Sequence, residues 1–302
     1  MIQEKPYVSI ITPISGAGID LSNLRHWLVK TQNLPIKTVL IHDEVDQQVH
    51  TNLELMVKEL SNPYIMLHHG KFGSPGAARN KGLEYLTTER VVFWDSDDIG
   101  EPHNLIQAIS DHRDSNVIVG SFTINSDLQV FDTQAKSLKG DQNLEIQLGM
   151  NPGIWRYIFK RSVISDTQFS TTRMGEDQQF LIEIQAIPKM LSITPLILYN
   201  YFVGNPNHLT SQYSAKLEVI QTFNSMQKFF VNRPEKLNLF EITIYLKLLW
   251  STMKYSKRSN YFGTLASFSY LFFISRKIAP SNLIQIVGFV RHQREIHYDE
   301  NE

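Results

Sequence analysis

The sequence contains no cysteine in its 302 residues. This absence excludes a thiolate nucleophile, cysteine-ligated zinc, iron–sulfur clusters and disulfide bonds. The demanding chemistry must therefore come from carboxylates, histidines or metal ions bound through oxygen. A chain without cysteine is also compatible with a reducing compartment such as the cytoplasm.

Net charge is nearly absent as well. The chain carries 29 lysine and arginine residues against 30 aspartate and glutamate residues, which gives a formal charge of -1. Proteins that bind nucleic acid by neutralising its phosphates usually have a clear positive excess. We therefore expect no nucleic-acid partner.

Long apolar runs are missing too. The longest, Tyr261 to Ile274, contains Thr264, Ser267 and Ser269 and is shorter than the roughly 20 residues that cross a bilayer. Met1 to Pro6 are polar and mixed in charge, and the apolar stretch behind them is too short for the core of a signal peptide. We expect no transmembrane helix and a protein that stays in the cytoplasm.

The chain does contain a regular alternation of short apolar strands and helices. Strands are expected at 7–13, 38–42, 64–67, 91–94 and 117–122, with helices at 21–31, 53–60 and 77–86 and a strand at 128–131 in an antiparallel excursion. This alternation predicts an α/β fold with a mostly parallel sheet and helices on both faces. Ligands bind such sheets at the carboxyl ends of the strands.

The pattern changes near residue 216. Apolar residues then recur every three or four positions, at Leu217, Ile220, Phe223, Met226 and Phe230, which predicts helices. We expect an α/β domain at 1–215 and a helical C-terminal region at 216–302. The aromatic and basic residues of that region suit contact with an anionic membrane, a homodimer, or a cover over the first domain. The basic residues are Lys254, Lys257, Arg258, Arg276, Lys277, Arg291 and Arg294.

An acidic tetrapeptide, Asp95-Ser96-Asp97-Asp98, directly follows the strand at 91–94. Three carboxylates this close repel one another unless a cation or hydrogen-bond donors compensate them. Mg²⁺ and Mn²⁺ favour carboxylate oxygens and are often shared with substrate phosphates. Taken alone, the tetrapeptide fits an acidic turn that caps the next helix equally well, so both interpretations stay open.

Four sequence blocks occur in an order and at a spacing that resemble family 2 of the glycosyltransferases, whose members have a GT-A fold. The blocks are VSIITP at 8–13, GAARNKGL at 76–83, FWDSDD at 93–98 and MGED at 174–177. The resemblance spans about residues 6–210. It implies a nucleotide-binding GT-A sheet and an inverting enzyme that depends on Mn²⁺ or Mg²⁺. The implied reaction moves a sugar from a UDP-sugar or another nucleotide-diphosphate sugar to a saccharide or lipid-linked saccharide. The implied pathway is synthesis of bacterial capsule, lipopolysaccharide or cell-wall glycan.

The resemblance also implies roles for individual residues on the donor side. The nucleotide sugar would contact Thr12, Pro13, Asp43, Arg79, Asp95, Ser96 and Asp97. The metal would be bound by Asp97 and Asp98, and by His208 in the loop after the last expected strand. A lone loop histidine is more often simply solvated, and that alternative stays open for His208.

On the acceptor side, the resemblance implies that Asp177 is the catalytic base and that Trp155 and Glu176 line the acceptor. A sugar hydroxyl is a poor nucleophile at neutral pH, so a carboxylate within hydrogen-bond reach must take its proton. The alternative is that Glu176 and Asp177 only favour the dipole at a helix N-terminus. Trp155 and Phe159, four residues apart, could likewise belong to the core.

Two other functions compete with this interpretation of the sequence. Gly16-Ala17-Gly18 after the first strand suggests an NAD-binding oxidoreductase, but Leu21 stands where the third glycine of that fingerprint would be. A catalytically inactive sugar-binding or scaffold protein of the same fold is the second alternative. The complete acidic set with Asp177 argues against it, because binding alone requires no base.

One local sequence departs from the pattern of the family, and three histidines show no pattern of their own. After the second strand the chain has His42-Asp43-Glu44-Val45 where many relatives have Asp-Asp-Gly-Ser, so the base contact at Asp43 is less closely matched. His42, His68 and His69 show no recognisable metal-ligand spacing. We interpret these histidines as structural or surface residues.

Overall fold

The computed structural model describes residues 5–15, 19–43, 46–126, 130–131, 144–184, 191–203, 213–256 and 274–288. The chain divides into two compact units, one of residues 1–139 and 153–212, the other of residues 140–152 and 213–302. The expected boundary at 215/216 stays a prediction. Several residues discussed above lie outside the described ones: Gly16, Ala17, Gly18, Glu44, Val45, Leu128, Gln129, His208, Lys257, Arg258, Arg291 and Arg294.

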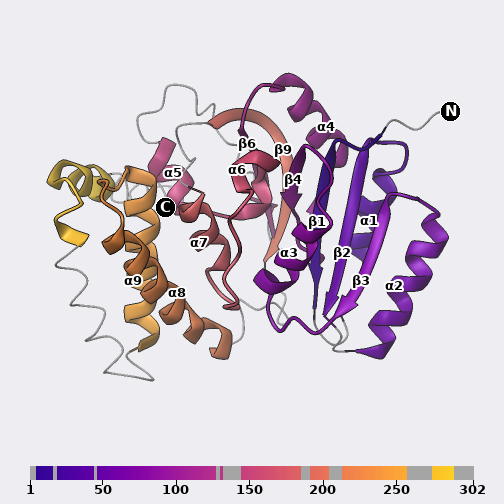
Figure 1. Ribbon diagram of the computed structural model, residues 1–302, viewed down its shortest axis with the longest axis horizontal. Coiled ribbons are helices and arrows are strands. Elements are labelled where there is room, and N and C mark those ends of the chain that lie inside the picture. The colour runs from indigo at the N-terminus through magenta and orange to yellow at the C-terminus, as the bar shows by residue number, and fades with distance from the viewer. Residues whose placement is uncertain are drawn as a thin grey trace. The chain divides into compact units, whose positions relative to one another are not determined.

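The first unit is built on a nine-stranded sheet with the order β3-β2-β1-β4-β8-β6-β9-β5, and β7 pairs with β6 (Figure 1). Neighbours among β1, β2, β3 and β4 are parallel, whereas β8 runs antiparallel to β4 and β6. The expected fold class, an α/β GT-A fold, is confirmed. The strands are β1 Val8–Ile14, β2 Ile36–Asp43, β3 Ile65–Gly70, β4 Arg90–Phe93, β5 Ile99–Gly100, β6 Val117–Ser126, β7 Val130–Phe131, β8 Tyr157–Lys160 and β9 Leu191–Val203.

The helices of this unit follow the expected alternation. They are α1 Ser22–Lys30, α2 Gln47–Leu60, α3 Pro75–Glu84, α4 Pro102–Asp111, α6 Arg161–Ile164 and α7 Glu176–Glu183, with a 3-10 turn η1 at Ile154–Arg156. Helix α2 begins at Gln47 rather than at residue 53, because the Asp46 carboxylate caps it by accepting the Gln48 N–H at 2.8 Å. Strand β8 was not expected, since a strand of four residues carries too short a periodic signal.

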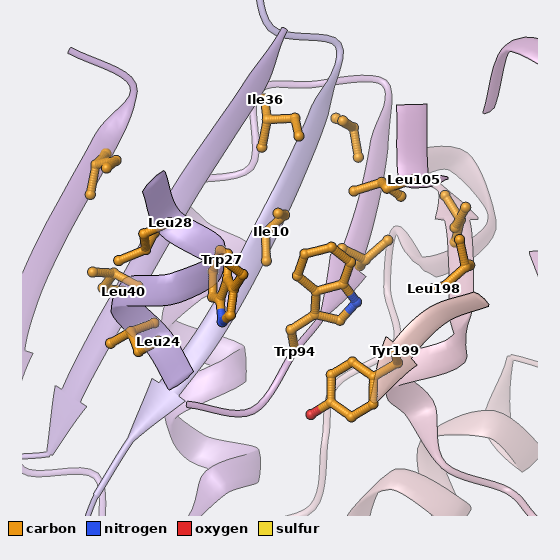
Figure 2. Close-up of a cluster of buried hydrophobic side chains, with 14 of the residues drawn as sticks. Ile10, Leu24, Trp27, Leu28, Ile36, Leu40, Trp94, Leu105, Leu198 and Tyr199 are labelled. Carbon is orange, nitrogen blue, oxygen red and sulfur yellow. The ribbon is translucent and has the colours of Figure 1, made fainter. Parts of the chain in front are cut away.

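The core lies on both faces of the sheet. Alternate residues of a strand point to opposite faces, so Ile10 packs with Trp27 of α1, whereas Ile11 faces Gly82 of α3. Figure 2 shows the first of these faces, where the Trp27 and Trp94 rings meet edge-on with centroids 5.4 Å apart. Burial on the two faces holds α1 and α3 against opposite sides of β1.

Strand β1 extends beyond the carboxyl end of its neighbour β4. Its pairing with β4 ends at Ile11 and Phe93, while its pairing with β2 continues to Ile14. The Ile11 carbonyl accepts the Trp94 N–H at 3.2 Å, just past the end of β4. Because residues two apart in a strand point their backbone groups to the same side, the Pro13 nitrogen also faces the β4 side, at a level that β4 no longer reaches. A proline is tolerated there because no ladder hydrogen bond is lost. The acidic tetrapeptide begins at this opening.

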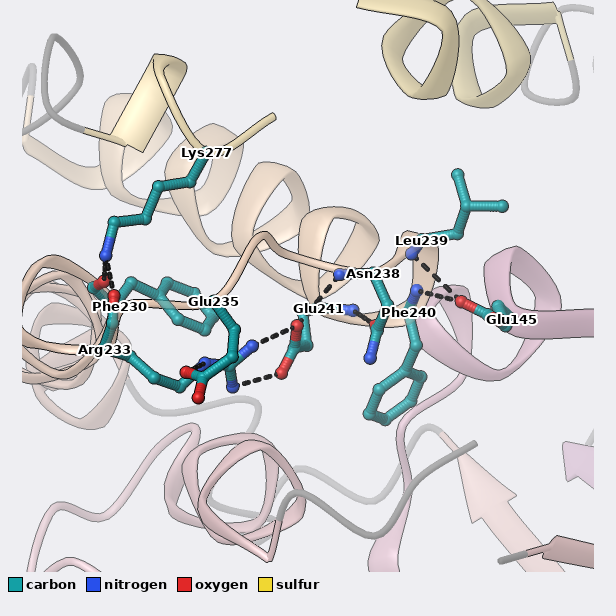
Figure 3. A network of polar contacts seen from close by, with 9 residues as sticks. All are labelled: Glu145, Phe230, Arg233, Glu235, Asn238, Leu239, Phe240, Glu241 and Lys277. Atoms are coloured by element: carbon teal, nitrogen blue, oxygen red, sulfur yellow. Dashed lines mark hydrogen bonds and ion pairs between the residues drawn. The ribbon is translucent and has the colours of Figure 1, made fainter. Parts of the chain in front are cut away.

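The second unit is helical, with α5 Leu144–Met150, α8 Tyr213–Asn232, α9 Leu239–Ser256 and a further helix at 280–288. Asn238 and Glu241 cap α9 reciprocally, each side chain accepting the other's backbone N–H at 2.9 and 3.0 Å (Figure 3). Glu241 also accepts two bonds from Arg233, and the Lys277 ammonium donates to the carbonyls of Phe230, Val231 and Arg233.

The described helices include none with the length and apolar character needed to cross a bilayer.

Replacing Gly76 in α3 by alanine tests how closely this helix must approach the chain at Ser170. The added Cβ would lie 2.0 Å from the Ser170 carbonyl oxygen, a backbone atom that cannot move aside. We expect Gly76→Ala to lower the free energy of unfolding by about 1–3 kcal/mol, the usual cost of overpacking.

The matched control is Gly288→Ala at the end of the 280–288 helix, where an added Cβ meets nothing within 4 Å. That variant should be neutral or stabilising, because alanine favours helices. Urea unfolding measures both, and equal stability of the two variants would contradict the close approach.

Candidate active site

The centre of the site is a buried arginine that joins two distant segments. Arg79 of α3 is 4% exposed. It donates to Asp95 Oδ1 at 2.7 Å and to Glu176 Oε1 at 2.8 Å. Its guanidinium carbon lies 5.4 Å from the centroid of the Phe169 ring. One side chain therefore ties the acidic tetrapeptide after β4 to the first residue of α7.

Charges reinforce this bridge. Burial alone would lower the pKa of Arg79, but the negative charges of Asp95, Glu176 and Asp177 outweigh it and raise that pKa above its ordinary value. Burial, together with the charge of Asp177, raises the pKa of Glu176 to about 7, and Arg79 opposes this shift. The charges of Asp95 and Asp177 thus act on one guanidinium, which places both carboxylates in the same neighbourhood.

Strand β9 fixes the tetrapeptide from the other side. Asp98 is 1% exposed; its Oδ2 accepts the Tyr199 hydroxyl at 2.8 Å and its Oδ1 accepts the Phe202 N–H at 2.7 Å. The same Tyr199 oxygen accepts the Asp95 N–H at 3.1 Å. Two residues of β9 therefore determine how the tetrapeptide leaves β4.

The carboxylate oxygens of the tetrapeptide suit a hard divalent cation. Burial first, and then the charges of Asp97 and Asp95, raise the pKa of Asp98 to about 9, against the opposing hydrogen bonds from Phe202 and Tyr199. A cation would relieve this repulsion between carboxylates. A carboxylate offers about four acceptor positions, so the two hydrogen bonds to Asp98 leave room for a metal. Oxygen donors of this kind fit Mg²⁺ or Mn²⁺.

An aromatic stack lies beside the tetrapeptide. The partly exposed Trp155 ring is stacked on Tyr199, with centroids 4.7 Å apart and planes 10° apart, and on Tyr201 at 5.8 Å. The Trp155 carbonyl accepts the indole N–H of Trp94 at 3.2 Å. Phe159, by contrast, is fully buried in β8. Of Trp155 and Phe159, only Trp155 is thus partly accessible.

Helix α7 separates its two acidic residues. Gly175 precedes it with φ 84, a left-handed conformation that favours glycine. Glu176 is then buried against Arg79, whereas Asp177 stays partly exposed and accepts the Gln178 N–H at 2.8 Å. The helix N-terminus also favours negative charge here. The geometry leaves Asp177, rather than Glu176, accessible to solvent.

The remaining donor-side residues are held in place by the fold. The Asp43 carboxylate accepts the N–H groups of Phe72 and Gly73 at 2.9 and 2.7 Å, which fixes the loop before α3. Thr12 is fully buried, and its hydroxyl has no hydrogen-bond partner among the described residues. Pro13 and Ser96 are also buried. Their contacts with a ligand stay predictions, as do those of the other site residues.

Two residues of the site were not found by sequence reasoning. Tyr199 bonds Asp98, and the Asn23 side-chain amide donates to the Asp97 carbonyl at 2.7 Å. A tyrosine in an apolar strand is typical of a core position, so Tyr199 carried no distinguishing signal. Asn23 lies in α1, far from the tetrapeptide in sequence, and only the fold brings the two together.

Comparison with known proteins gives a consistent result. The model of glycosyl transferase family 2 matches residues 31–175, which include Asp43, Arg79 and the tetrapeptide and end just before Glu176. The glycosyltransferase EpsH of Bacillus subtilis (strain 168) is 23% identical over 231 residues, which cover 71% of this chain and 65% of EpsH. The chain therefore spans slightly less than two thirds of that curated relative.

Solved structures share the fold. S. aureus TarS (residues 1–349) in complex with UDP-GlcNAc is 18% identical with a TM-score of 0.69, covering 88% of this chain and 81% of TarS. The mannosyltransferase PcManGT of Pyrobaculum calidifontis, in complex with GDP-Man and Mn²⁺, is 12% identical with a TM-score of 0.56. That alignment covers 95% of this chain and 80% of PcManGT.

Removing the bridging arginine tests how much it contributes to the stability of the fold. Arg79→Met leaves Asp95 and the buried Glu176 without their shared cation, and breaking a buried ion pair in this way typically costs about 3–5 kcal/mol. We expect the midpoint of urea unfolding to fall accordingly.

Arg25→Met is the matched control, because it breaks the Arg25–Glu59 pair of 2.8 Å, whose side chains are 53% and 59% exposed. An exposed pair contributes little, so this midpoint should hardly move. If both variants unfolded at the same urea concentration, the bridge would not be an important contact.

Proposed function

The chain belongs to glycosyl transferase family 2, and on that premise we propose that it transfers a sugar from a nucleotide-diphosphate sugar to a saccharide acceptor with inversion. The observation that carries this proposal is the bridge from Asp95 through Arg79 to Glu176. It joins the acidic tetrapeptide, on the donor side, to the helix that presents Asp177. A donor subsite and a base are thereby held in one rigid arrangement.

Asp177 is the proposed base. Its carboxylate accepts the proton of an acceptor hydroxyl while that oxygen forms a bond to the anomeric carbon of the donor. The bond between that carbon and the diphosphate breaks, and the nucleoside diphosphate leaves. The partial exposure of Asp177 and its position next to the Arg79 network support this role.

Asp97 and Asp98 would hold the proposed Mn²⁺ or Mg²⁺. When bound, the ion supplies positive charge to the leaving diphosphate. Support comes from the raised pKa of Asp98, which is caused by its burial and by the negative charges of Asp97 and Asp95, because a bound cation would relieve this repulsion. Asp95 is turned toward Arg79 and so orients the tetrapeptide. His208 lies outside the described residues, and its role stays a prediction.

The acceptor would lie against the aromatic stack. The Trp155 ring, supported by Tyr199 and Tyr201, offers a flat apolar surface suited to the apolar face of a pyranose. Glu176 is engaged by Arg79, so we assign it the task of fixing the first turn of α7 on the acceptor side. Glu176 would then affect binding of the acceptor indirectly, by holding Asp177 in position.

For the donor and the pathway, the relatives suggest where to begin. The UDP-GlcNAc bound to TarS and the GDP-Man and Mn²⁺ bound to PcManGT support a nucleotide-diphosphate sugar, with UDP-sugars tested first. We propose a role in bacterial surface-polysaccharide synthesis on the cytoplasmic side, with a saccharide or lipid-linked saccharide as acceptor. Membrane contact or dimerisation through the C-terminal helices remains part of this proposal.

The first test of the proposal is release of nucleoside diphosphate from a panel of UDP- and GDP-sugars, with Mn²⁺, with Mg²⁺ and with EDTA. We expect one donor to react, and EDTA to abolish the reaction until Mn²⁺ is restored. An acceptor mixture of simple and lipid-linked saccharides should raise the rate. If no donor released nucleoside diphosphate with any acceptor, and calorimetry showed no binding of UDP or GDP, the result would favour an inactive scaffold.

The second test is Asp177→Asn, which removes the base but keeps the size of the side chain. Transfer should fall by about 10²–10⁴, the usual contribution of general acid–base catalysis, while donor and Mn²⁺ affinity stay within twofold. Glu183→Gln, at the other end of α7, is the control and should keep full activity. Equal loss of transfer and of donor binding in Asp177→Asn would show that the residue has a different role.

A further inference from the structure

Three histidines that are far apart in sequence meet at one edge of the first unit. His42 is the penultimate residue of β2 and pairs in register with His69 of β3, while His50 lies on α2. Sequence spacing did not indicate this cluster, and the interpretation of His42 and His69 as structural or surface residues stays a prediction. The parallel pairing of β2 with β3 and the packing of α2 against β3 bring them together.

The three rings converge closely. The Nδ1 atoms of His42 and His69 are 3.0 Å apart, and the ring centroids of His50 and His69 are 3.8 Å apart. One ring nitrogen from each histidine lies within 4.8 Å of the other two. Within the described part of the chain, these histidines are the one group of three or more potential ligands that meet this criterion.

We propose that His42, His50 and His69 form a transition-metal site, with Zn²⁺ as the ion that fits best. Zn²⁺–N bonds of about 2.0–2.1 Å in a tetrahedron place the nitrogens about 3.4 Å apart, so small side-chain rotations would complete the site. Three imidazoles leave the fourth position to water. Imidazole ligands select Zn²⁺, Ni²⁺ or Cu²⁺ over Mg²⁺ and Mn²⁺.

A nearby carboxylate supports a cation here. Glu54, one turn after His50 on α2, has its Oε1 3.4 Å from His50 Nε2. Histidines that bind metals commonly have such a carboxylate partner, which orients the ring and raises its basicity. His42 is 1% exposed, while His50 and His69 are partly exposed. The site is thus closed on the side of the sheet and reachable from the side of α2.

This site is distinct from the acidic tetrapeptide. Strand β1 lies between β2 and β4, which separates the two sites by two strand spacings, or about 10 Å. A metal at the histidines would fasten α2 to the ends of β2 and β3. Asp43, the residue after His42, holds the Phe72 and Gly73 N–H groups, so the ion would also brace the loop that leads into α3. The inference is independent of the proposed transferase activity.

The experiment uses the full-length protein without a polyhistidine tag, stripped with EDTA and dialysed. Calorimetric titration with Zn²⁺ should show one site per chain, and the melting temperature should rise with Zn²⁺ concentration. Co²⁺ at the same site should give visible absorption bands typical of tetrahedral nitrogen coordination.

The variants are His50→Ala and Glu54→Gln, with His103→Ala on the exposed surface of α4 as the matched control. His50→Ala should weaken Zn²⁺ binding at least about 100-fold and Glu54→Gln about 10-fold, in line with losses of ligands and their partners. The control should bind as the wild type does. Alanine is compatible with the α2 helix, and an unchanged circular dichroism spectrum and an unchanged urea midpoint in EDTA would show that His50→Ala is folded.

Equal Zn²⁺ affinity in wild type and His50→Ala would overturn the proposal, as would the absence of calorimetric Zn²⁺ binding to the wild type. The contact between His42 and His69 would then be an ordinary hydrogen bond between two imidazoles. Because the readouts are metal affinity and melting temperature, a failed transferase assay leaves this result unaffected.

Discussion

The ion-paired Arg79 is the constraint on which the candidate site depends. A guanidinium buried this deeply is stable only because Asp95 and Glu176 each accept one of its hydrogen bonds. The arginine in turn holds the turn after β4 and the start of α7 in one position. The proposed donor side and the proposed acceptor side are therefore joined through one side chain, and Gly76, one turn earlier in α3, lets that helix lie close enough.

A second set of contacts works from the opposite side. Tyr199 bonds both Asp98 and the Asp95 backbone and also supports the Trp155 ring. The same strand thus orients the proposed metal ligands and the proposed sugar-stacking surface. Changes in β9 should affect the proposed donor and acceptor sides together, because Tyr199 contacts both. The histidine cluster lies near the same carboxyl end of the parallel strands, but on the other side of β1, at β2 and β3.

Much of the fold could be predicted because the N-terminal half repeats a strong local pattern. Each apolar run from β1 to β4 is followed by a turn and an amphipathic or small-residue helix, and parallel pairing needs little more than that. Prediction failed where local signals are weak. Strand β8 is four residues long, and β5 is only two; both exist because long-range pairing stabilises them. The start of α2 was misplaced because a capping aspartate, rather than apolar periodicity, determines it.

By itself, the sequence determined the fold class and the types of residue available for chemistry: a strand that runs into three carboxylates, an arginine in a small-residue helix, and a Glu-Asp pair at the start of another helix. Only the tertiary structure decided which of these meet. It paired Arg79 with Asp95 and Glu176, left Asp177 accessible, added Tyr199 and Asn23, and gathered His42, His50 and His69. The physical reason is that strand order and helix packing, which place residues distant in sequence side by side, depend on burial over the whole domain and leave no local pattern.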